Sequence, residues 1–314
     1  MGEAKPVTIL TVTLDTLTAS HGSYGQHVDD TGTAWILTGL KGWTAGPGRR
    51  TAHSERPTAD GAHRSAAYRG TRTLELVGRM FPPTVELGWE HADRLAALCP
   101  DPGERYPLVV QGAHRTLVAY VEQAGDILID PVSPRIWDWS VPLVAADPYR
   151  YDLAWTSASA AGGDPGSGGI DFGGSGADFS SPGLDMGTAP AYIDATVAGA
   201  GTAEALLVLQ VTGPTNNVQV EGLGTPSVVG VRGAVAAGEA LFVNCTGRVA
   251  FDVPGCAVPI PARGAVLGGQ NARGAIWVSG GWPALLPGEL RTFRMSGATG
   301  PGSSLTVHAR GAWV

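Results

Sequence analysis

Two pairs of carboxylates come closest, in this sequence, to the spacing of a catalytic arrangement. Asp29 and Asp30 are adjacent, and Asp101 and Glu104 stand three positions apart. Two carboxylates can act as general acid and base on a glycosidic bond, provided that the fold holds them at a set separation. Adjacency in a loop determines neither that separation nor the two pKa values, so the pattern favours solvated acids over a catalytic pair.

The signatures of other enzyme classes are missing from the sequence. It contains no GxSxG, no HExxH and no Walker lysine, so an activated serine, a zinc protease helix and a phosphate-binding loop are not indicated. We therefore predict that the chain is not an enzyme and has no catalytic residue and no cofactor. The histidines are scattered, mostly in stretches typical of loops: His21, His27, His53, His63, His91, His114 and His308.

Metal sites are not indicated either. Residues 173–178 partly match the glycine-rich repeat that presents carbonyls and aspartates to calcium, but the match occurs once and Ser180 stands where the repeat requires an apolar residue. A linker is the favoured interpretation. Cys99, Cys245 and Cys256 are an odd number without CxxC spacing, which indicates buried free thiols in a protein assembled in a reducing cytoplasm.

Tryptophans offer a different kind of chemistry, because an exposed indole can stack on the face of a sugar ring. Most of them are expected to anchor cores or interfaces instead. A carbohydrate-binding jelly-roll module for attachment to a host surface therefore stands as the alternative function. The nine are Trp35, Trp43, Trp89, Trp137, Trp139, Trp155, Trp277, Trp282 and Trp313.

Charge and composition narrow the possible partners. The net charge is −7, only Lys5 and Lys41 are lysine, and no basic stripe emerges, so sequence-specific binding of nucleic acid is not expected. No apolar run of about 18 residues occurs, which argues against a membrane span. Charged residues make up 16% of the chain, against about 25% in typical globular proteins. A surface with so few charges is more readily covered by partner subunits.

The chain is long enough for two units of roughly 150 residues. The apolar run 141–144 predicts the last strand of the first unit, and Pro148 then ends the ladder because proline has no N–H to donate. Behind it, residues 157–188 are mostly Gly, Ser, Ala, Asp and Pro, too poor in large apolar groups for a core element. We predict a β domain over 1–152, a glycine-rich connection over 153–189 and a second β domain over 190–314.

The first domain is predicted as a β-sandwich or barrel-like unit with one short helix. Residues 135–140 lead into the closing strand 141–144, with Trp137 and Trp139 expected on one face. Residues 90–99 predict the helix, since Ala is dense and Leu95 and Leu98 share a face. Residues 39–65 lack an apolar period and predict a long arm with interface candidates Arg49, Arg50, Arg56 and Arg64. The remaining predicted strands are 7–14, 33–38, 67–78, 84–87, 107–111, 115–122 and 126–130.

The second domain is predicted as a jelly-roll sandwich, because short strands alternate with glycine breaks and no helical period occurs. At the break Pro287-Gly288, Gly288 is expected in the positive-φ position of a type II turn. The predicted strands are 191–197, 205–211, 218–221, 228–231, 241–244, 249–253, 275–278, 291–295 and 305–309.

The order of these elements resembles that of a known family. The first domain closes on the run 143–151, and three stretches of the second, 196–217, 237–249 and 282–291, carry the likeness: an opening strand pair, a hairpin that begins with Gly238-Glu239, and a tryptophan and leucine run with a Pro-Gly turn. This pattern resembles the distal tail proteins of bacteriophages with long non-contractile tails, and it implies a galectin-like jelly roll for the second domain.

The resemblance also implies a function and partners. It implies a structural virion protein whose six copies form a ring at the tail tip, joining the tail tube protein to the tail-tip hub, fibre or baseplate proteins. The first domain would build the ring and the second would face outward. The virion tail tip, with assembly in the host cytoplasm, is the expected location. The long arm would reach a neighbouring copy, where its arginines would meet carboxylates.

Overall fold

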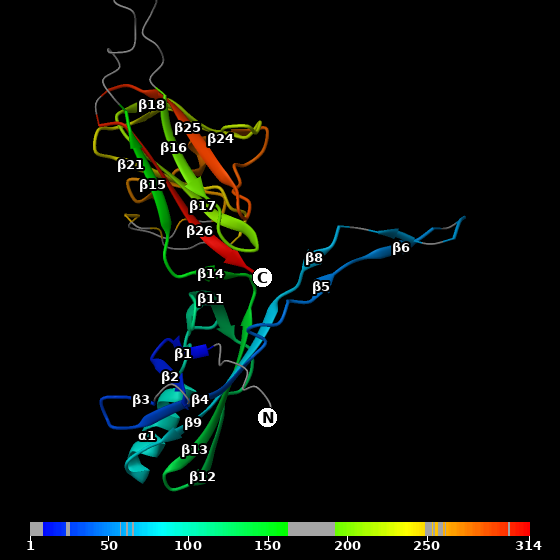
Figure 1. The fold of residues 1–314 in the computed structure, drawn as a ribbon, viewed down its shortest axis with the longest axis vertical. Helices are drawn as coiled ribbons and strands as arrows, with labels where there is room; N and C mark the ends of the chain where they lie inside the picture. Colours follow the sequence, from blue (N-terminus) through cyan, green and yellow to red (C-terminus); the bar gives the residue numbers. More distant parts are fainter. Residues whose placement is uncertain are drawn as a thin grey trace, which may run out of the picture. The chain divides into compact units, whose positions relative to one another are not determined.

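The computed structural model describes residues 9–22, 26–56, 58–60, 62–64, 66–162, 192–248, 253, 255–256, 260, 262–300 and 302–314. The chain divides into two compact units, one made of Met1–Leu153 with Trp313–Val314 and the other of Ala154–Ala312. Both are built mainly of strands (Figure 1), which confirms the predicted fold class. In the part of the chain that the structure describes, no helix is long and apolar enough to cross a membrane.

Seven strands of the first unit close into a barrel. They pair in the order β13, β9, β4, β2, β1, β10 and β11, and β11 pairs again with β13. All these pairs are antiparallel except β2 with β4. Their bounds are β1 Ile9–Leu14, β2 Leu17–His21, β4 Ala34–Lys41, β9 Arg72–Phe81, β10 Tyr106–Gly112, β11 Thr116–Gln123 and β13 Ile136–Ala145. Three further strands add to this sheet: β3 His27–Val28, β12 Leu128–Ser133 and β14 Arg150–Asp152.

Strand β13 shows how the sequence directs the barrel. Every second residue along it is buried, as expected of a strand with one face on a core. Trp137 and Trp139 are both 2% exposed and belong to the core, which confirms the prediction that they lie on one face of the strand. Gly78 of β9 lies opposite Trp139, and a Cβ there would fall 2.0 Å from a ring carbon. The missing side chain therefore makes the space that the indole fills.

The helix begins earlier than its periodicity predicts. Helix α1 spans Val85–Ala96, so the predicted strand 84–87 is wrong. The reason is local: the Thr84 hydroxyl caps the helix by accepting from the Leu87 N–H at 3.3 Å, and Glu86 lies in the first turn. β-Branched Thr84 and Val85 suggest a strand only when this cap is overlooked. Gly88 faces Trp137, where a Cβ would fall 2.7 Å from the indole nitrogen.

The second unit is a sandwich of two sheets around one apolar core. The first sheet has the order β15 Thr156–Ala161, β26 Ser304–Trp313, β17 Ala203–Thr212, β21 Ala240–Asn244, β22 Ala265–Leu267 and β23 Gln270–Asn271. The second has the order β16 Ile193–Ala198, β25 Leu290–Ala298, β18 Thr215–Gly222, β19 Val228–Val231 and β24 Ile276–Ser279, with β20 Ala234–Val235 on β18. A short 3₁₀ turn, η2 Arg273–Ala275, precedes β24. Leu209, Val220 and Phe293 are typical of the core side chains.

The boundaries of the units differ from the predicted ones. Within the predicted connection 153–189, strand β15 pairs with β26 from Thr156 to Ala161, so these residues belong to the second unit. Their Ser and Ala side chains are small, so the composition of this stretch does not indicate a strand. Ala158 nevertheless packs against the core. Residues 163–189, and most of the predicted strand 249–253, lie outside the described residues. At the other end, Trp313 counts with the first unit, where its indole donates to Asp152 Oδ1 at 2.9 Å.

Two single positions were expected to shape turns. Strand β13 ends at Ala145, ahead of Pro148, whose carbonyl accepts a hydrogen bond from Arg72 Nε at 3.0 Å. Gly288 has φ +73°, and the N–H of Glu289 donates to the carbonyl of Leu286 at 3.2 Å, which is the geometry of a type II turn.

Candidate functional site: the arm between β4 and β9

The segment 42–71 leaves the barrel at the end of β4 and returns at the start of β9 as an extended hairpin (Figure 1). Two short antiparallel ladders hold it: β5 Arg49–Arg50 with β8 Tyr68–Arg69, and β6 His53–Glu55 with β7 Ala62–Arg64. The N–H of Gly70 donates to the carbonyl of Gly48 at 2.6 Å and closes the base of the first ladder. We call residues 42–71 the arm.

The arm has no core of its own. Among its described residues from 44 to 71, none is buried, and the ring of Tyr68 is 66% exposed. Trp43, by contrast, is 4% exposed and packs in the barrel core. A hairpin this short, with both faces in solvent, is at best marginally stable on its backbone bonds alone. Its extended shape has to be supported at its base or by a partner.

Arg72 supplies the support at the base. Its guanidinium is 2% exposed, and Nη1 donates to the carbonyls of Gly42, Trp43 and Ala45 at 2.9, 3.0 and 2.6 Å. Its Nε donates to the carbonyl of Pro148. Arg72, which follows the last residue of the arm, therefore links the start of the arm to the turn after β13. Burial, then the charges of Arg150 and Arg69, lower the pKa of Arg72 to about 10, and the group stays charged at neutral pH.

Arg150 gives the base a second clamp. Its Nη1 donates to the carbonyl of Trp43 at 2.8 Å, and its guanidinium lies 5.5 Å from the centre of the Trp43 ring. Its Nη2 donates to the carbonyl of Val314, a residue of the same unit. Burial lowers the pKa of Arg150, and Arg115 lowers it further. The first residues of the arm are therefore fixed from two sides, and near the end of the arm the guanidinium of Arg69 lies 5.9 Å from the centre of the Tyr149 ring.

The four interface candidates lie on this arm. Arg49 and Arg50 form β5 and are exposed, Arg56 is exposed beyond β6, and Arg64 belongs to β7. No carboxylate of the described residues forms an ion pair with Arg49, Arg50 or Arg56. Five arginines lie between positions 49 and 69, against the carboxylates Glu55 and Asp60 alone. In the rest of the first unit carboxylates outnumber basic residues, so the arm is the basic part of an acidic unit.

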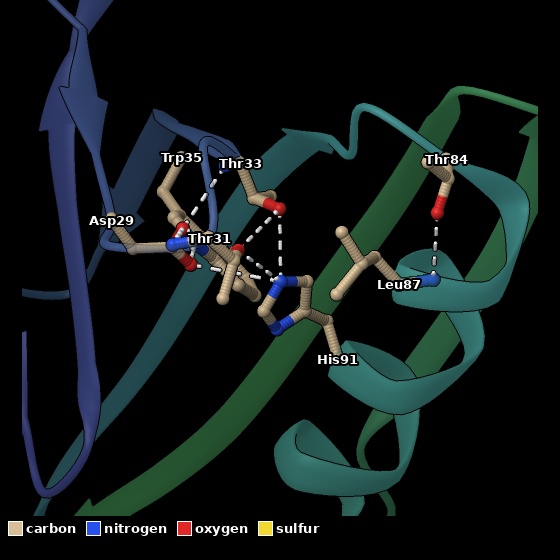
Figure 2. A network of polar contacts seen from close by, with 7 residues as sticks. All are labelled: Asp29, Thr31, Thr33, Trp35, Thr84, Leu87 and His91. Carbon is tan, nitrogen blue, oxygen red and sulfur yellow. Dashed lines mark hydrogen bonds and ion pairs between the residues drawn. The ribbon is translucent and has the colours of Figure 1, made fainter.

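A buried polar network in the barrel involves one carboxylate of the Asp29-Asp30 pair (Figure 2). Oδ1 of Asp29 accepts from the backbone N–H groups of Thr31 and Thr33, both at 3.0 Å, and from the Thr31 hydroxyl at 2.6 Å. Oδ2 accepts from the indole N–H of Trp35 at 2.9 Å. The prediction of a solvated acid is wrong for Asp29, whose carboxylate organises a turn, whereas Asp30 is exposed. The Asp-x-Thr spacing of an Asx turn was the overlooked signal.

Helix α1 joins the network through His91, whose ring is 1% exposed. Nε2 of His91 lies 2.8 Å from the Thr33 hydroxyl, which lies 3.1 Å from the Thr31 hydroxyl. The Thr31 hydroxyl already donates its hydrogen to Asp29, so it can only accept from Thr33. The Thr33 hydroxyl then donates to Thr31 and accepts from the Nε2–H of His91. In that tautomer Nδ1, which has no partner, is a buried lone pair and not a buried N–H. The network thus holds α1 to the turn before β4.

The pKa values of His91 and Asp29 are both lowered in this network. Burial lowers the pKa of His91, although the nearby Asp29 opposes the shift, and the ring stays neutral. For Asp29, burial raises the pKa, but the hydrogen bonds from Thr31, Trp35 and Thr33 together lower it below its ordinary value. A cavity of about 160 Å³ adjoins the pair. Within the described ranges, no group of three or more His, Cys, Asp or Glu side chains could hold a metal ion.

The other sequence candidates are dispersed. Asp101 and Glu104 are exposed in one loop, as solvated acids would be. Cys99 and Cys245 are buried free thiols and Cys256 is partly buried. Burial raises the pKa of Cys99 to about 11, so its thiol stays protonated and inert at neutral pH. Among the candidates drawn from the sequence, the four arginines of the arm are those that the structure brings together on one element, the hairpin of β5 to β8.

The sequence and the structure of this chain were compared with those of known proteins. No protein-family model and no curated protein matches the sequence. The crystal structure of the SPP1 Dit protein (gp 19.1), described as a paradigm of the hub adsorption apparatus in phages infecting Gram-positive bacteria, is similar over 97% of this chain and 99% of its own, with a TM-score of 0.59 and 12% identity. The chain has the fold of a distal tail protein. A chain of the phage P2 baseplate, in its activated conformation with Ca, covers 92% of this chain and 98% of its own, with a TM-score of 0.41 and 10% identity.

The resemblance drawn from the sequence is thereby confirmed at the level of fold. At this identity the distal tail fold does not decide the function, because one fold hosts many functions and function has to be argued from the site.

Proposed function

We propose that this chain is a structural subunit of a phage tail tip, and that copies of its first unit assemble into a closed ring through the arm. The observation that carries the proposal is the arm itself. It is an extended hairpin with no buried described residue beyond Trp43, and a buried arginine holds it at its base. A hairpin whose described residues beyond Trp43 all lie at the surface is best explained by a partner that covers it.

Charge complementarity favours a second copy as that partner. The arm carries an excess of arginines and the remainder of the same unit an excess of carboxylates. A contact in which the arm of one copy lies on the acidic part of the next is heterologous, and such contacts close into rings when the rotation between copies divides a full turn. Arginine suits this contact, because its planar guanidinium binds carboxylates through two parallel hydrogen bonds.

The number of copies in the ring and its other partners are inferred from the resemblance to distal tail proteins. A distal tail protein would form a ring of six copies in the virion tail tip, between the tail tube protein and the hub, fibre or baseplate proteins, after assembly in the host cytoplasm. A structural role of this kind needs no catalytic group and no cofactor. This role is supported by the similarity in fold to SPP1 Dit and by the exposed arm.

The experiment is a matched pair of arm variants. In the first, residues 49–69 are replaced by a two-residue turn between Gly48 and Gly70, which keeps the closing hydrogen bond and every carbonyl that Arg72 holds. In the second, Arg49 and Arg50 become Glu, which keeps the length. We expect wild type to form a ring by light scattering and both variants to elute as folded monomers. A shortened variant that still forms the ring would contradict the role of the arm.

A further inference from the structure

A cavity of about 160 Å³ lies in the first unit, between helix α1 and the segments around β2 and β3. Leu17, Leu95 and Leu98 give it an apolar wall and are each at most 5% exposed. Asp30 and Arg94 also line it but are exposed, so the cavity opens to the surface. An apolar cavity of about 150 Å³ can hold a benzene molecule, so this space is large enough for a group of about six heavy atoms.

Nδ1 of His91 is a buried acceptor in the wall of this cavity. It forms no hydrogen bond with any described residue, whereas Nε2 of the same ring contacts Thr33. Figure 2 shows Nδ1 on the side of the ring away from Thr33, toward the later turns of α1, from which Arg94 and Leu95 line the cavity. In the tautomer derived above, Nδ1 is a lone pair that can accept a hydrogen bond but not donate one. A ligand that donates to it would remove the cost of leaving this acceptor unpaired.

The charges around the cavity favour a cationic ligand. Besides burial, which is the largest influence on the pKa of His91, three carboxylates and one guanidinium act on this ring, namely those of Asp29, Asp30, Glu90 and Arg94. The surroundings are therefore net negative, and the Asp29 side chain is only 18% exposed. Its Oδ2 accepts a hydrogen bond from Trp35 and has a second lone pair for another donor. The other polar groups of the wall are the hydroxyls of Thr16 and Thr18 and the imidazole of His27.

We propose that this cavity binds the side chain of a lysine from another protein. The ammonium group would donate to Nδ1 of His91 and be attracted to the carboxylates of Asp29 and Asp30. The flexible four-carbon stem would pack on the leucines of the wall, and it is short enough for a space of this volume. The main chain of the partner would stay outside, at the exposed rim.

The rim distinguishes a lysine from other cations. A diamine would bring its second ammonium group toward the guanidinium of Arg94, whereas the peptide carbonyl beside a lysine would accept a hydrogen bond from it. An arginine side chain carries five N–H donors on a wider planar group, which suits a flat carboxylate better than a single buried acceptor. This chain has only two lysines, Lys5 and Lys41, and Lys41 forms an ion pair with Glu75 at 2.8 Å. The lysine is therefore expected on a different protein.

The test uses the full chain and four small probes at constant ionic strength: Nα-acetyl-L-lysine methylamide, the corresponding norleucine and arginine amides, and 1,4-diaminobutane. Titration calorimetry measures the affinity, and NMR of the histidine ring nitrogens shows which imidazole responds. We expect the lysine amide to bind and to shift the Nδ1 resonance of His91. It should bind about tenfold more tightly than the norleucine amide, which has the same stem without the ammonium group. The arginine amide and the diamine should also bind more weakly than the lysine amide.

Two variants and a matched control locate the binding. His91→Gln, which can still donate to Thr33 but lacks the acceptor, should weaken binding of the lysine amide about tenfold. Asp30→Asn, which removes a charge at the exposed rim, should weaken it about threefold. Asp126→Asn changes an exposed aspartate of the same unit that does not line the cavity, and should bind as wild type does. Circular dichroism shows whether each variant has kept its fold.

Several results would overturn the proposal: no binding of the lysine amide, equal binding of the norleucine amide, tighter binding of the diamine or the arginine amide, or an affinity unchanged in His91→Gln. Ammonium chloride that displaces the lysine amide at equal concentration would show a site for small cations only, and would overturn it too. If His91→Gln does not fold, the NMR shift of His91 in wild type and the affinity of Asp30→Asn decide. The probes reach one cavity whether or not the chain forms rings, so a negative result here leaves the proposed ring untouched.

Discussion

The barrel pair β9–β13 and the arm pairs β5–β8 and β6–β7 are all antiparallel ladders, yet they are stabilised by different means. In β13 every second side chain is buried, and Gly78 of β9 is shaped to receive Trp139. In the arm no described residue beyond Trp43 is buried, and the ladders are two and three residue pairs long. The barrel strands are held by packing, whereas the arm is held at its base and its described residues beyond Trp43 lie at the surface.

The largest effect is expected at the place where the two regions meet. Arg72→Met should lower the free energy of unfolding of the first unit by about 3 kcal/mol, because it removes the charged donor to the carbonyls of Gly42, Ala45 and Pro148. Arg49→Met, on the exposed part of the arm, should change it by no more than about 0.5 kcal/mol. Urea denaturation followed by tryptophan fluorescence measures both. Equal effects of the two substitutions would mean that the arm base is not a clamp.

A pair of glycine variants sharpens the same contrast. Gly78→Ala places a methyl 2.0 Å from Trp139 and should cost about 2 kcal/mol through overpacking. Gly46→Ala places a methyl in the arm where no atom lies within 4 Å, and should leave the stability within about 0.5 kcal/mol of wild type. Thermal melts of the two variants are the measurement. A tolerated Gly78→Ala would show that the barrel core is looser than its register implies.

The pH dependence of stability should come from the barrel and not from the arm. His91 has a pKa lowered from 6.5 in the folded state, so below pH 6.5 the unfolded chain binds more protons than the folded one. The stability is therefore full above pH 6.5 and declines as the pH falls below it. Asp29, whose pKa is lowered from 3.8, adds a second loss only as the pH falls below 3.8.

His91→Gln, whose amide can still donate to Thr33, should remove the first decline from the unfolding transition of the first unit. His308, whose pKa burial also lowers, belongs to the second unit and should not affect that transition. The shortened arm variant should keep the decline unchanged. Urea midpoints between pH 8 and about 5 decide the matter, and a decline that persists in His91→Gln would refute the assignment.

The sequence predicts best where burial alternates along a strand. The run around Trp137 was placed correctly because a strand with one face on a core repeats every two residues. The arm ladders carry no such signal, since both of their faces meet solvent, and the Ser and Ala residues of β15 look like a linker. Such strands are defined by their partners, and pairing partners cannot be read from local composition.

Of the candidate site, the sequence predicts the arm but not the residues that hold its base. The arm and its arginines follow from a stretch without apolar period, but Arg72 does not, because its partners are backbone carbonyls that only the fold brings together. The link between Asp29 and His91 joins a turn to a helix far along the chain. Likewise, the close approach of Trp277 to Gly230 depends on the register between β19 and β24.

The central claim is that the arm joins neighbouring copies in a closed ring, and electron microscopy of the purified wild-type chain tests it most directly. Class averages should show rings with sixfold symmetry, in which density for each arm continues onto the adjacent subunit. A monodisperse monomer that fails to assemble, even when tail tube protein is added, would contradict the account.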